Sequence, residues 1–273
     1  MKTITVLPLL LLFLLMACKP NNGPINDKIV SDDSLESVKR SGVIRWGADV
    51  VGGEPYVYED PKNPGVYIGF EVDIAANIAK QLGVKPELVI DPWDNLIPDL
   101  QKGDFDIAMN GIEGTEDRAK IVMFSEPYFV YAQQITVRQE TQGINKLEDL
   151  KGKTVATLSG TAAEDILRSI PQILVKINPE IIYSYQDLEN GKVDAVVLDS
   201  IIADAYGITN LKLKNTGEPF GEGFYIIAFR QNQVALRDAI NNILKRMKEN
   251  GELRAIYEKW KIMNPQQASI GIR

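Results

Sequence analysis

The sequence of 273 residues contains no histidine and a single cysteine, Cys18. A Ser–His–Asp triad needs histidine, and the usual zinc sites need His or Cys ligands, so both are excluded. A cysteine nucleophile beside a histidine and a disulfide within the chain are excluded as well. The chain also has no GxxxxGK[ST] loop for a nucleotide phosphate. We therefore expect no metal and no cofactor, and any catalysis would rest on carboxylates, Lys, Tyr or Ser.

Basic residues are fewer than acidic ones, 30 Lys and Arg against 37 Asp and Glu, which gives a formal net charge of -7. This balance disfavours nucleic acid as a partner, because nucleic-acid binding depends on cationic surfaces. The chain is 45% hydrophobic and 25% charged. That composition predicts a globular protein with one or two cores rather than a disordered chain.

Residues 1–17 have a short basic start and then an apolar run, Ile4 to Ala17. The run is too short for a comfortable bilayer span and is typical of an export signal. A buried or membrane helix is the alternative, but Pro8 inside the run and the polar "KPNNGPIND" after it disfavour that interpretation. The ending "LMAC" resembles the lipobox of bacterial lipoproteins, which predicts a lipid on Cys18. Residues 18–36 would then form a tether between a membrane anchor and the folded part, at the periplasmic or cell surface.

Short apolar runs at 43–46, 88–90 and 105–109 alternate with helical patterns such as Phe70, Ile74, Ile78 and Leu82. The alternation returns after residue 139 as "KTVATL", "TAAEDILRSI" and "VDAVVL", and the chain ends in two helices separated by Gly251. Alternating strands and helices predict an α/β protein made of two parallel-sheet units of about a hundred residues each.

The stretch "NGIEGTEDR", residues 110–118, directly follows the apolar run 105–109. Ligands of open α/β sheets lie beyond the carboxyl ends of the strands. Gly111 and Gly114 leave the backbone accessible there, and the Arg118 guanidinium could bind a ligand carboxylate through two hydrogen bonds. The alternative is an internal salt bridge of Arg118 with Glu113 or Asp117.

The order of motifs resembles the polar amino-acid-binding proteins of bacterial ABC importers, solute-binding protein family 3. The resemblance covers residues 37–262 and rests on several segments taken together: "RWGAD", "GFEVDIAANIAKQLG", "WDNLIPDLQKGDFDIAMNGI", "TEDRAK", "FSEPYF", "LKGKTVATLSGT", "YQDLENGKVDAVVLDS" and "IYEKW". It implies a two-lobed periplasmic-binding-protein clamshell of type II with two interlobe crossings, near Tyr131 and Phe220. Lobe 1 would be residues 37–131 and 220–264, and lobe 2 residues 132–219.

The resemblance also implies roles for site residues. Arg118 would bind the α-carboxylate of a ligand and Asp199 its α-ammonium, although an Asp at that position could simply cap a helix. Thr161 and Ala162 match a loop whose helix-start amides help to hold the carboxylate. Trp93 would line the side-chain pocket, unless it is a core residue. Asp49 would contact a cationic side chain, unless it is a solvated loop acid.

Two positions depart from the family pattern. The first ligand loop usually carries an aromatic residue after the aspartate, but here it is "VVGGEPY", so Tyr56 is the nearest ring. Position 113 is more often Ser or Thr, whereas this chain has Glu113. If Arg118 takes an anion while Glu113 and Asp199 approach a cation, the charges match those of an amino-acid zwitterion.

The implied function is that of an extracytoplasmic receptor, which we expect to be a monomer, that binds a free amino acid and delivers it to an ABC permease in the inner membrane. Because Asp49, Glu54, Glu113 and Asp199 outnumber Arg118, we expect a cationic amino acid, or a neutral polar one if Glu113 only orients its neighbours. The alternative is an enzyme of the cyclohexadienyl dehydratase type on the same fold, with Glu113 or Glu164 as general acid. A sensory domain is a third possibility, but no transmembrane helix or signalling module follows residue 262.

Lipidation can be tested by replacing the only cysteine. Cys18→Ser should abolish incorporation of a labelled fatty acid into the expressed protein, because the thiol is the acceptor. Equal labelling of parent and variant would contradict the lipobox interpretation.

Overall fold

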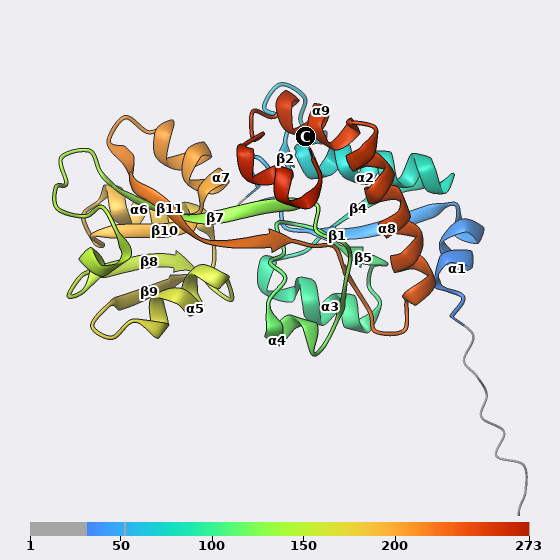
Figure 1. Ribbon diagram of the computed structural model, residues 1–273, viewed down its shortest axis with the longest axis horizontal. Helices are drawn as coiled ribbons and strands as arrows, with labels where there is room; N and C mark the ends of the chain where they lie inside the picture. Colours follow the sequence, from blue (N-terminus) through green and yellow to red (C-terminus); the bar gives the residue numbers. More distant parts are fainter. Residues whose placement is uncertain (1–31, 52, 273) are drawn as a thin grey trace, which may run out of the picture. The chain divides into compact units, whose positions relative to one another are not determined.

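The computed structural model describes residues 32–51 and 53–272, so residues 1–31, with the predicted signal and Cys18, lie outside it. Within this part, one sheet has the strand order β4-β1-β5-β12-β6, of which Figure 1 labels β1, β4 and β5. Strand β1 is parallel to β4 and β5, whereas β12 is antiparallel to β5 and β6. The strand bounds are β1 Val43–Ala48, β4 Lys85–Ile90, β5 Ile107–Ala108, β6 Met123–Phe124 and β12 Ala228–Phe229. The helices of this lobe are α1 Ser34–Ser41, α2 Phe70–Leu82, η1 Trp93–Asn95, α3 Leu96–Lys102, α4 Glu116–Ala119, α8 Val234–Glu249, α9 Glu252–Lys259 and η4 Pro265–Ile270.

The second sheet has the order β11-β7-β10-β8-β9. Its strands are β7 Phe129–Arg138, β8 Thr154–Leu158, β9 Leu174–Asn178, β10 Ala195–Asp199 and β11 Leu213–Tyr225. The helices of this lobe are η2 Leu147–Leu150, α5 Ala162–Ser169, α6 Ile181–Glu189, α7 Ser200–Ile202 and the π-helical turn η3 Ala203–Ile208. A small hairpin, β2 Tyr58–Glu59 with β3 Tyr67–Ile68, pairs apart from both sheets.

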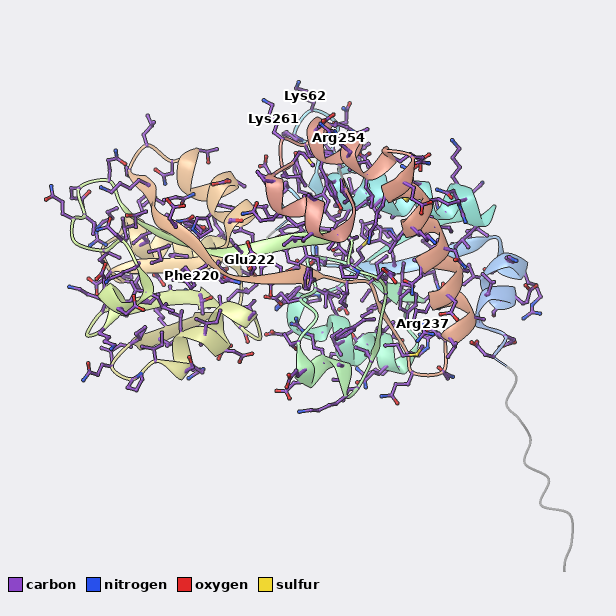
Figure 2. All side chains as sticks on the ribbon, in the orientation of Figure 1. Lys62, Phe220, Glu222, Arg237, Arg254 and Lys261 are labelled. Carbon is purple, nitrogen blue, oxygen red and sulfur yellow. The ribbon has the colours of Figure 1, made fainter. Side chains whose placement is uncertain are left out.

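The chain passes from the first sheet to the second between β6 and β7 and returns between β11 and β12. Strands β7 and β11 run antiparallel side by side, from Phe129 opposite Tyr225 to Arg138 opposite Leu213 (Figure 1). Figure 2 shows Phe220 and Glu222 on β11, in the part where the pairing register shifts. The two-lobed type II clamshell is therefore confirmed, with two crossings, while the lobe boundaries themselves stay a prediction.

Helix α2 illustrates how the sequence pattern forms the elements. Phe70, Ile74 and Ile78 are fully buried at the predicted four-residue spacing. The helix ends at Gly83, whose φ of 78° is left-handed and whose N–H donates to the Ala79 and Lys80 carbonyls. The two terminal helices separated by Gly251 are confirmed in the same way.

One predicted strand is shorter than expected. The apolar run 105–109 forms a strand only at Ile107–Ala108. The reason is Asp106, whose side chain accepts a hydrogen bond from the backbone N–H of Arg45 at 2.9 Å, so a side chain replaces a backbone partner there. Met109 still donates its N–H to the Gly47 carbonyl, which keeps the following loop at the end of the sheet.

An aromatic cluster lies where the two crossing strands meet the first lobe. The rings of Phe129 and Tyr225 stack with centroids 5.6 Å apart, and Tyr131 stacks on Tyr225 at 4.8 Å. Tyr257 of α9 meets Phe129 edge to face at 5.2 Å. Such pairs add about 0.5–1.5 kcal/mol beyond their buried area. They fix Tyr225, whose hydroxyl donates to Asp199, a residue of the pocket described below.

In residues 32–51 and 53–272, no helix combines the length and the apolar character that crossing a membrane requires.

The first-lobe core can be tested by a matched pair of substitutions. Leu100→Ala removes a side chain that is 0% exposed and should lower the free energy of unfolding by about 2–5 kcal/mol, since it leaves a cavity. Leu211→Ala makes the same chemical change at a residue that is 92% exposed and should stay within about 0.5 kcal/mol of the parent. Urea unfolding followed by circular dichroism measures both, and equal effects would contradict this assignment of the core.

Candidate ligand-binding site

A pocket lies between the two lobes, at the carboxyl ends of β1, β5, β8 and β10. Its lining includes six of the residues predicted from the sequence: Asp49, Trp93, Gly111, Glu113, Thr161 and Asp199. The rest of the lining is mainly apolar or aromatic: Tyr56, Leu158, Ile181, Leu198 and Ile202, with Gly53 and Asn110. The lining residues include no Lys and no Arg in the described part of the chain. All three charged side chains in the wall are therefore acids.

Arg118 is held by Glu113. Its Nη1 donates to the Glu113 Oε2 atom at 2.6 Å and to the Glu113 carbonyl at 3.0 Å. Its Nη2 donates to the Gly160 carbonyl in the other lobe at 2.8 Å. Asp117, the other partner considered, pairs with Lys120 at 2.5 Å instead. The structure thus has the internal salt bridge, and Arg118 is not among the residues that line the pocket.

Glu113 also contacts the start of helix α5. Its Oε1 accepts a hydrogen bond from the Ala162 N–H at 3.0 Å. The Thr161 hydroxyl does not face an anion, since it accepts from the Glu164 N–H at 3.3 Å and donates to the Leu158 carbonyl, which caps the helix. The Glu113 side chain is 2% exposed. One protein carboxylate thus connects the guanidinium and the helix-start amide that the sequence assigned to a ligand carboxylate.

Asp199 ends β10 and is buried. It occupies the N-cap position of helix α7, but its side chain makes no capping hydrogen bond there. Its Oδ1 accepts from Gln133 Nε2 at 2.6 Å and its Oδ2 from the Tyr225 hydroxyl. Burial raises the pKa of Asp199 well above its usual value, and the charge of Glu113 raises it further. An incoming cation would offset both costs.

Trp93 and Asp49 both lie in the wall of the pocket. The Trp93 Nε1 donates to the Ser159 carbonyl of the other lobe at 2.9 Å, and the ring lies 5.4 Å from the Arg118 guanidinium carbon. The cation over this indole is therefore one of the protein's own side chains. Asp49 accepts from the Val51 N–H at 2.8 Å, and burial raises its pKa. It is not a fully solvated loop acid, whereas Glu54, counted with it from the sequence, lines a different pocket.

Gly111 and Glu71 fix the loop that carries Glu113. Gly111 has a φ of 63°, and a Cβ there would lie 2.6 Å from the Tyr56 ring, so both conformation and space require glycine. Its N–H donates to Glu71 Oε1 at 2.7 Å, and the same oxygen accepts from the Tyr128 hydroxyl. Glu71 is fully buried, and desolvation raises its pKa to about 7.

Sequence reasoning missed Glu71, Gln133 and Tyr225 as supports of the site. A glutamate in the first turn of a helix is typical of an exposed residue that favours the helix dipole, so nothing in the sequence indicates that Glu71 is buried. The described residues contain no group of three or more His, Cys, Asp or Glu side chains placed to hold a metal ion.

Comparison with known proteins decides the family. The model of the bacterial extracellular solute-binding proteins, family 3, matches residues 46–263. The chain belongs to this family. Members are extracytoplasmic proteins, and the resemblance inferred from the sequence motifs is confirmed.

Three similar proteins illustrate the range of relatives in family 3. This chain is 32% identical over 229 residues to the L-cystine-binding protein TcyJ of Escherichia coli (strain K12), and the match covers 83% of this chain and 85% of TcyJ. It is 34% identical over 224 residues to the arginine-binding periplasmic protein of Mannheimia haemolytica, covering 78% and 90%. The crystal structure of the ancestral amino acid-binding protein AncCDT-1, a precursor of cyclohexadienyl dehydratase, matches with a TM-score of 0.77 and 35% identity, covering 83% and 99%.

The raised pKa of Glu71 gives a dependence of stability on pH. The folded protein holds this proton up to about pH 7, whereas the unfolded chain releases it near the ordinary glutamate pKa of 4.5. Below about pH 4.5, protonated Glu71 contributes about 3 kcal/mol to the free energy of unfolding. This contribution is lost as the pH rises through about 7. Relative to the parent, Glu71→Gln should therefore gain stability on going from pH 4.5 to 8.

Urea unfolding at several pH values measures this difference. Glu87→Gln, at an exposed position of β4, is the matched control and should follow the parent across the range. Parallel curves for the parent and Glu71→Gln would show that Glu71 does not titrate in this interval.

Proposed function

We propose that this protein is the substrate receptor of an ABC importer for amino acids, and that it binds a free cationic amino acid between its lobes and delivers it to the permease. The observation that carries the ligand class is the pocket wall, in which Asp49, Glu113 and Asp199 are the only charged side chains of the described lining. Glu113 is paired with Arg118, whereas Asp49 and Asp199 have no ion pair among the described residues, and buried acids without a cation are costly. A ligand that brings positive charge supplies what the wall lacks.

The names of the relatives support an amino-acid ligand. Two of them are named for cystine and arginine, and the third is named an amino acid-binding protein. Those ligands differ in charge and shape, so the choice for this chain rests on its own wall. The acidic lining favours arginine, lysine or ornithine over glutamate, and apolar residues such as Leu198 and Ile202 offer a surface for an aliphatic chain.

Asp199 is the residue that we assign to the ligand ammonium. Its carboxylate is buried, lines the pocket and is oriented by Gln133 and Tyr225. Two fixed donors keep its position while leaving lone pairs for a third partner. Asp49, which follows β1 in the first lobe, would serve a second cationic group of the ligand.

The remaining expectations belong to the same proposal. A lipid on Cys18 would tether the receptor through residues 18–36 to a membrane, and the receptor would act as a monomer. A short anchor and a polar tether suit a protein that must meet a permease repeatedly at the membrane surface.

The dehydratase alternative has less support. It requires Glu113 or Glu164 as a general acid facing the substrate. Both oxygens of Glu113 already accept hydrogen bonds, from Arg118 and Ala162. Both oxygens of Glu164 do so as well, from Arg168 and the Gly160 N–H. Glu113 lines the pocket, but its carboxylate is held in an ion pair with Arg118, and Glu164 is not among the residues of the described lining, so neither is placed as a free general acid.

The ligand assignment can be tested by calorimetric titration of the twenty amino acids and ornithine. Cationic amino acids should bind most tightly, and Asp199→Asn should weaken them by about a hundredfold or more, since a buried ion pair loses one partner at a cost of about 3–5 kcal/mol. Asp204→Asn is the matched control, because Asp204 lines another pocket and should leave binding unchanged. Tighter binding of glutamate than of lysine, or parental affinity in Asp199→Asn, would refute the assignment.

A further inference from the structure

The donors suited to a ligand carboxylate are already occupied by a side chain of the protein. Arg118 Nη1 and the Ala162 N–H, 2.6 and 3.0 Å from the two Glu113 carboxylate oxygens, hold that group from both sides. The second terminal nitrogen of Arg118 donates to the Gly160 carbonyl. A ligand carboxylate would therefore have to displace Glu113 from a buried ion pair, which leaves one charge without its partner.

Little in the geometry allows Glu113 to move aside. Its backbone bridges Tyr225 of β11, and its carbonyl accepts a further bond from Arg118. The following N–H, that of Gly114, donates to the Phe224 carbonyl at 2.9 Å. Backbone and side chain are thus both held, and the side chain is 2% exposed.

The rest of the wall accepts cations and repels anions. Apart from Glu113 it offers Asp49 and Asp199, and a carboxylate placed there would face like charges in a poorly solvated space. Beside Asp199, the Gln133 amide donates through Nε2, while its Oε1 is buried and accepts no hydrogen bond from the described residues. Because the two amide atoms share one carbon, this acceptor lies close to Asp199. An ammonium group has three donors and could satisfy both.

We infer that the pocket recognises the ammonium groups of its ligand and not its carboxylate, so that amines without a carboxylate bind more tightly than the amino acids with the same skeleton. Glu113 takes the place of the ligand carboxylate. The chemical class is a small aliphatic or guanidino amine with one or two positive charges. This inference rests on the proposed function only in using the same interlobe pocket.

Matched pairs of ligands separate the two kinds of recognition. The probes are lysine with cadaverine, ornithine with putrescine, and arginine with agmatine, each pair differing by one carboxylate. Titrated into the parent protein, the amine of at least one pair should bind about tenfold or more tightly than its amino acid.

Replacing Glu113 by alanine should reverse the order of affinities within a pair, so that the amino acid binds more tightly than the amine. Glu113→Ala frees Arg118 and the Ala162 N–H for a ligand carboxylate, so the amino acid of the pair should gain affinity and the amine should lose it. Glu113→Gln keeps the size of the side chain but removes its charge, so the amine should weaken without a gain for the amino acid. Glu116→Ala, at an exposed acid that begins α4, should leave the amine the tighter ligand, as in the parent. Thermal unfolding of each variant establishes that it is folded.

The outcomes distinguish this inference from the proposed function. If the parent binds the amino acid more tightly than the amine in every pair and Glu113→Ala gives the amino acids no gain, the inference is overturned and the amino-acid receptor stands. If the amines bind more tightly and the order reverses in Glu113→Ala, the inference is supported. Binding of neither member of any pair to the parent would overturn both.

Discussion

The carboxylate of Glu113 is the group on which the arrangement of the pocket depends. It accepts hydrogen bonds from the Arg118 guanidinium of its own lobe and from the Ala162 N–H at the start of α5 in the other lobe, and it is almost completely buried. A buried ion pair of this kind adds little net stability, because desolvation offsets most of the attraction. Its effect is geometric. It orients Arg118 toward the Gly160 carbonyl and holds the loop after β5 against the start of α5.

Other buried acids are arranged behind this pair. Glu71 supports the Gly111 backbone, and Asp199 is oriented by Gln133 and Tyr225. Burial raises the pKa of both carboxyl groups. The aromatic cluster explains how the fold tolerates them, because Tyr225 and Tyr128 bring hydroxyl donors to these acids while their rings stay packed in the core. The polar site and the apolar core are thus one packed unit.

Much of this structure could be predicted from the sequence. Four-residue spacing predicted α2, and the order of motifs predicted the clamshell, since each depends on patterns that are local or short. Alternation predicted two parallel sheets, which is correct for β4-β1-β5 and β9-β8-β10 but wrong for β12 and β7, which are antiparallel to their neighbours. Six of the eight predicted ligand residues line one pocket for the same reason, because the ends of parallel strands meet at one edge of a sheet.

What the sequence could not decide is which partner each charge takes. The distance between Glu113 and Ala162 in the fold is set by the approach of two lobes whose segments lie 49 residues apart in sequence. Arg118 therefore had two open interpretations, and only the three-dimensional contacts choose the internal pair. Glu71 is a similar case, because its burial depends on Tyr128 and Gly111, which come from elements far along the chain.

The contacts between the lobes also limit what a ligand can contribute to closure. Glu113 to Ala162, Arg118 to Gly160 and Trp93 to Ser159 join the lobes through protein atoms alone. A ligand shifts a conformational equilibrium only by the interactions that it makes in one state and not in the other. A carboxylate that replaced Glu113 would exchange one set of these bonds for an equivalent set, with little gain for the closed form. Under the proposed function, a cation placed between Asp49 and Asp199 would add attraction that these contacts between protein atoms do not supply. Positive charge is therefore the feature of a ligand with which this pocket would gain most.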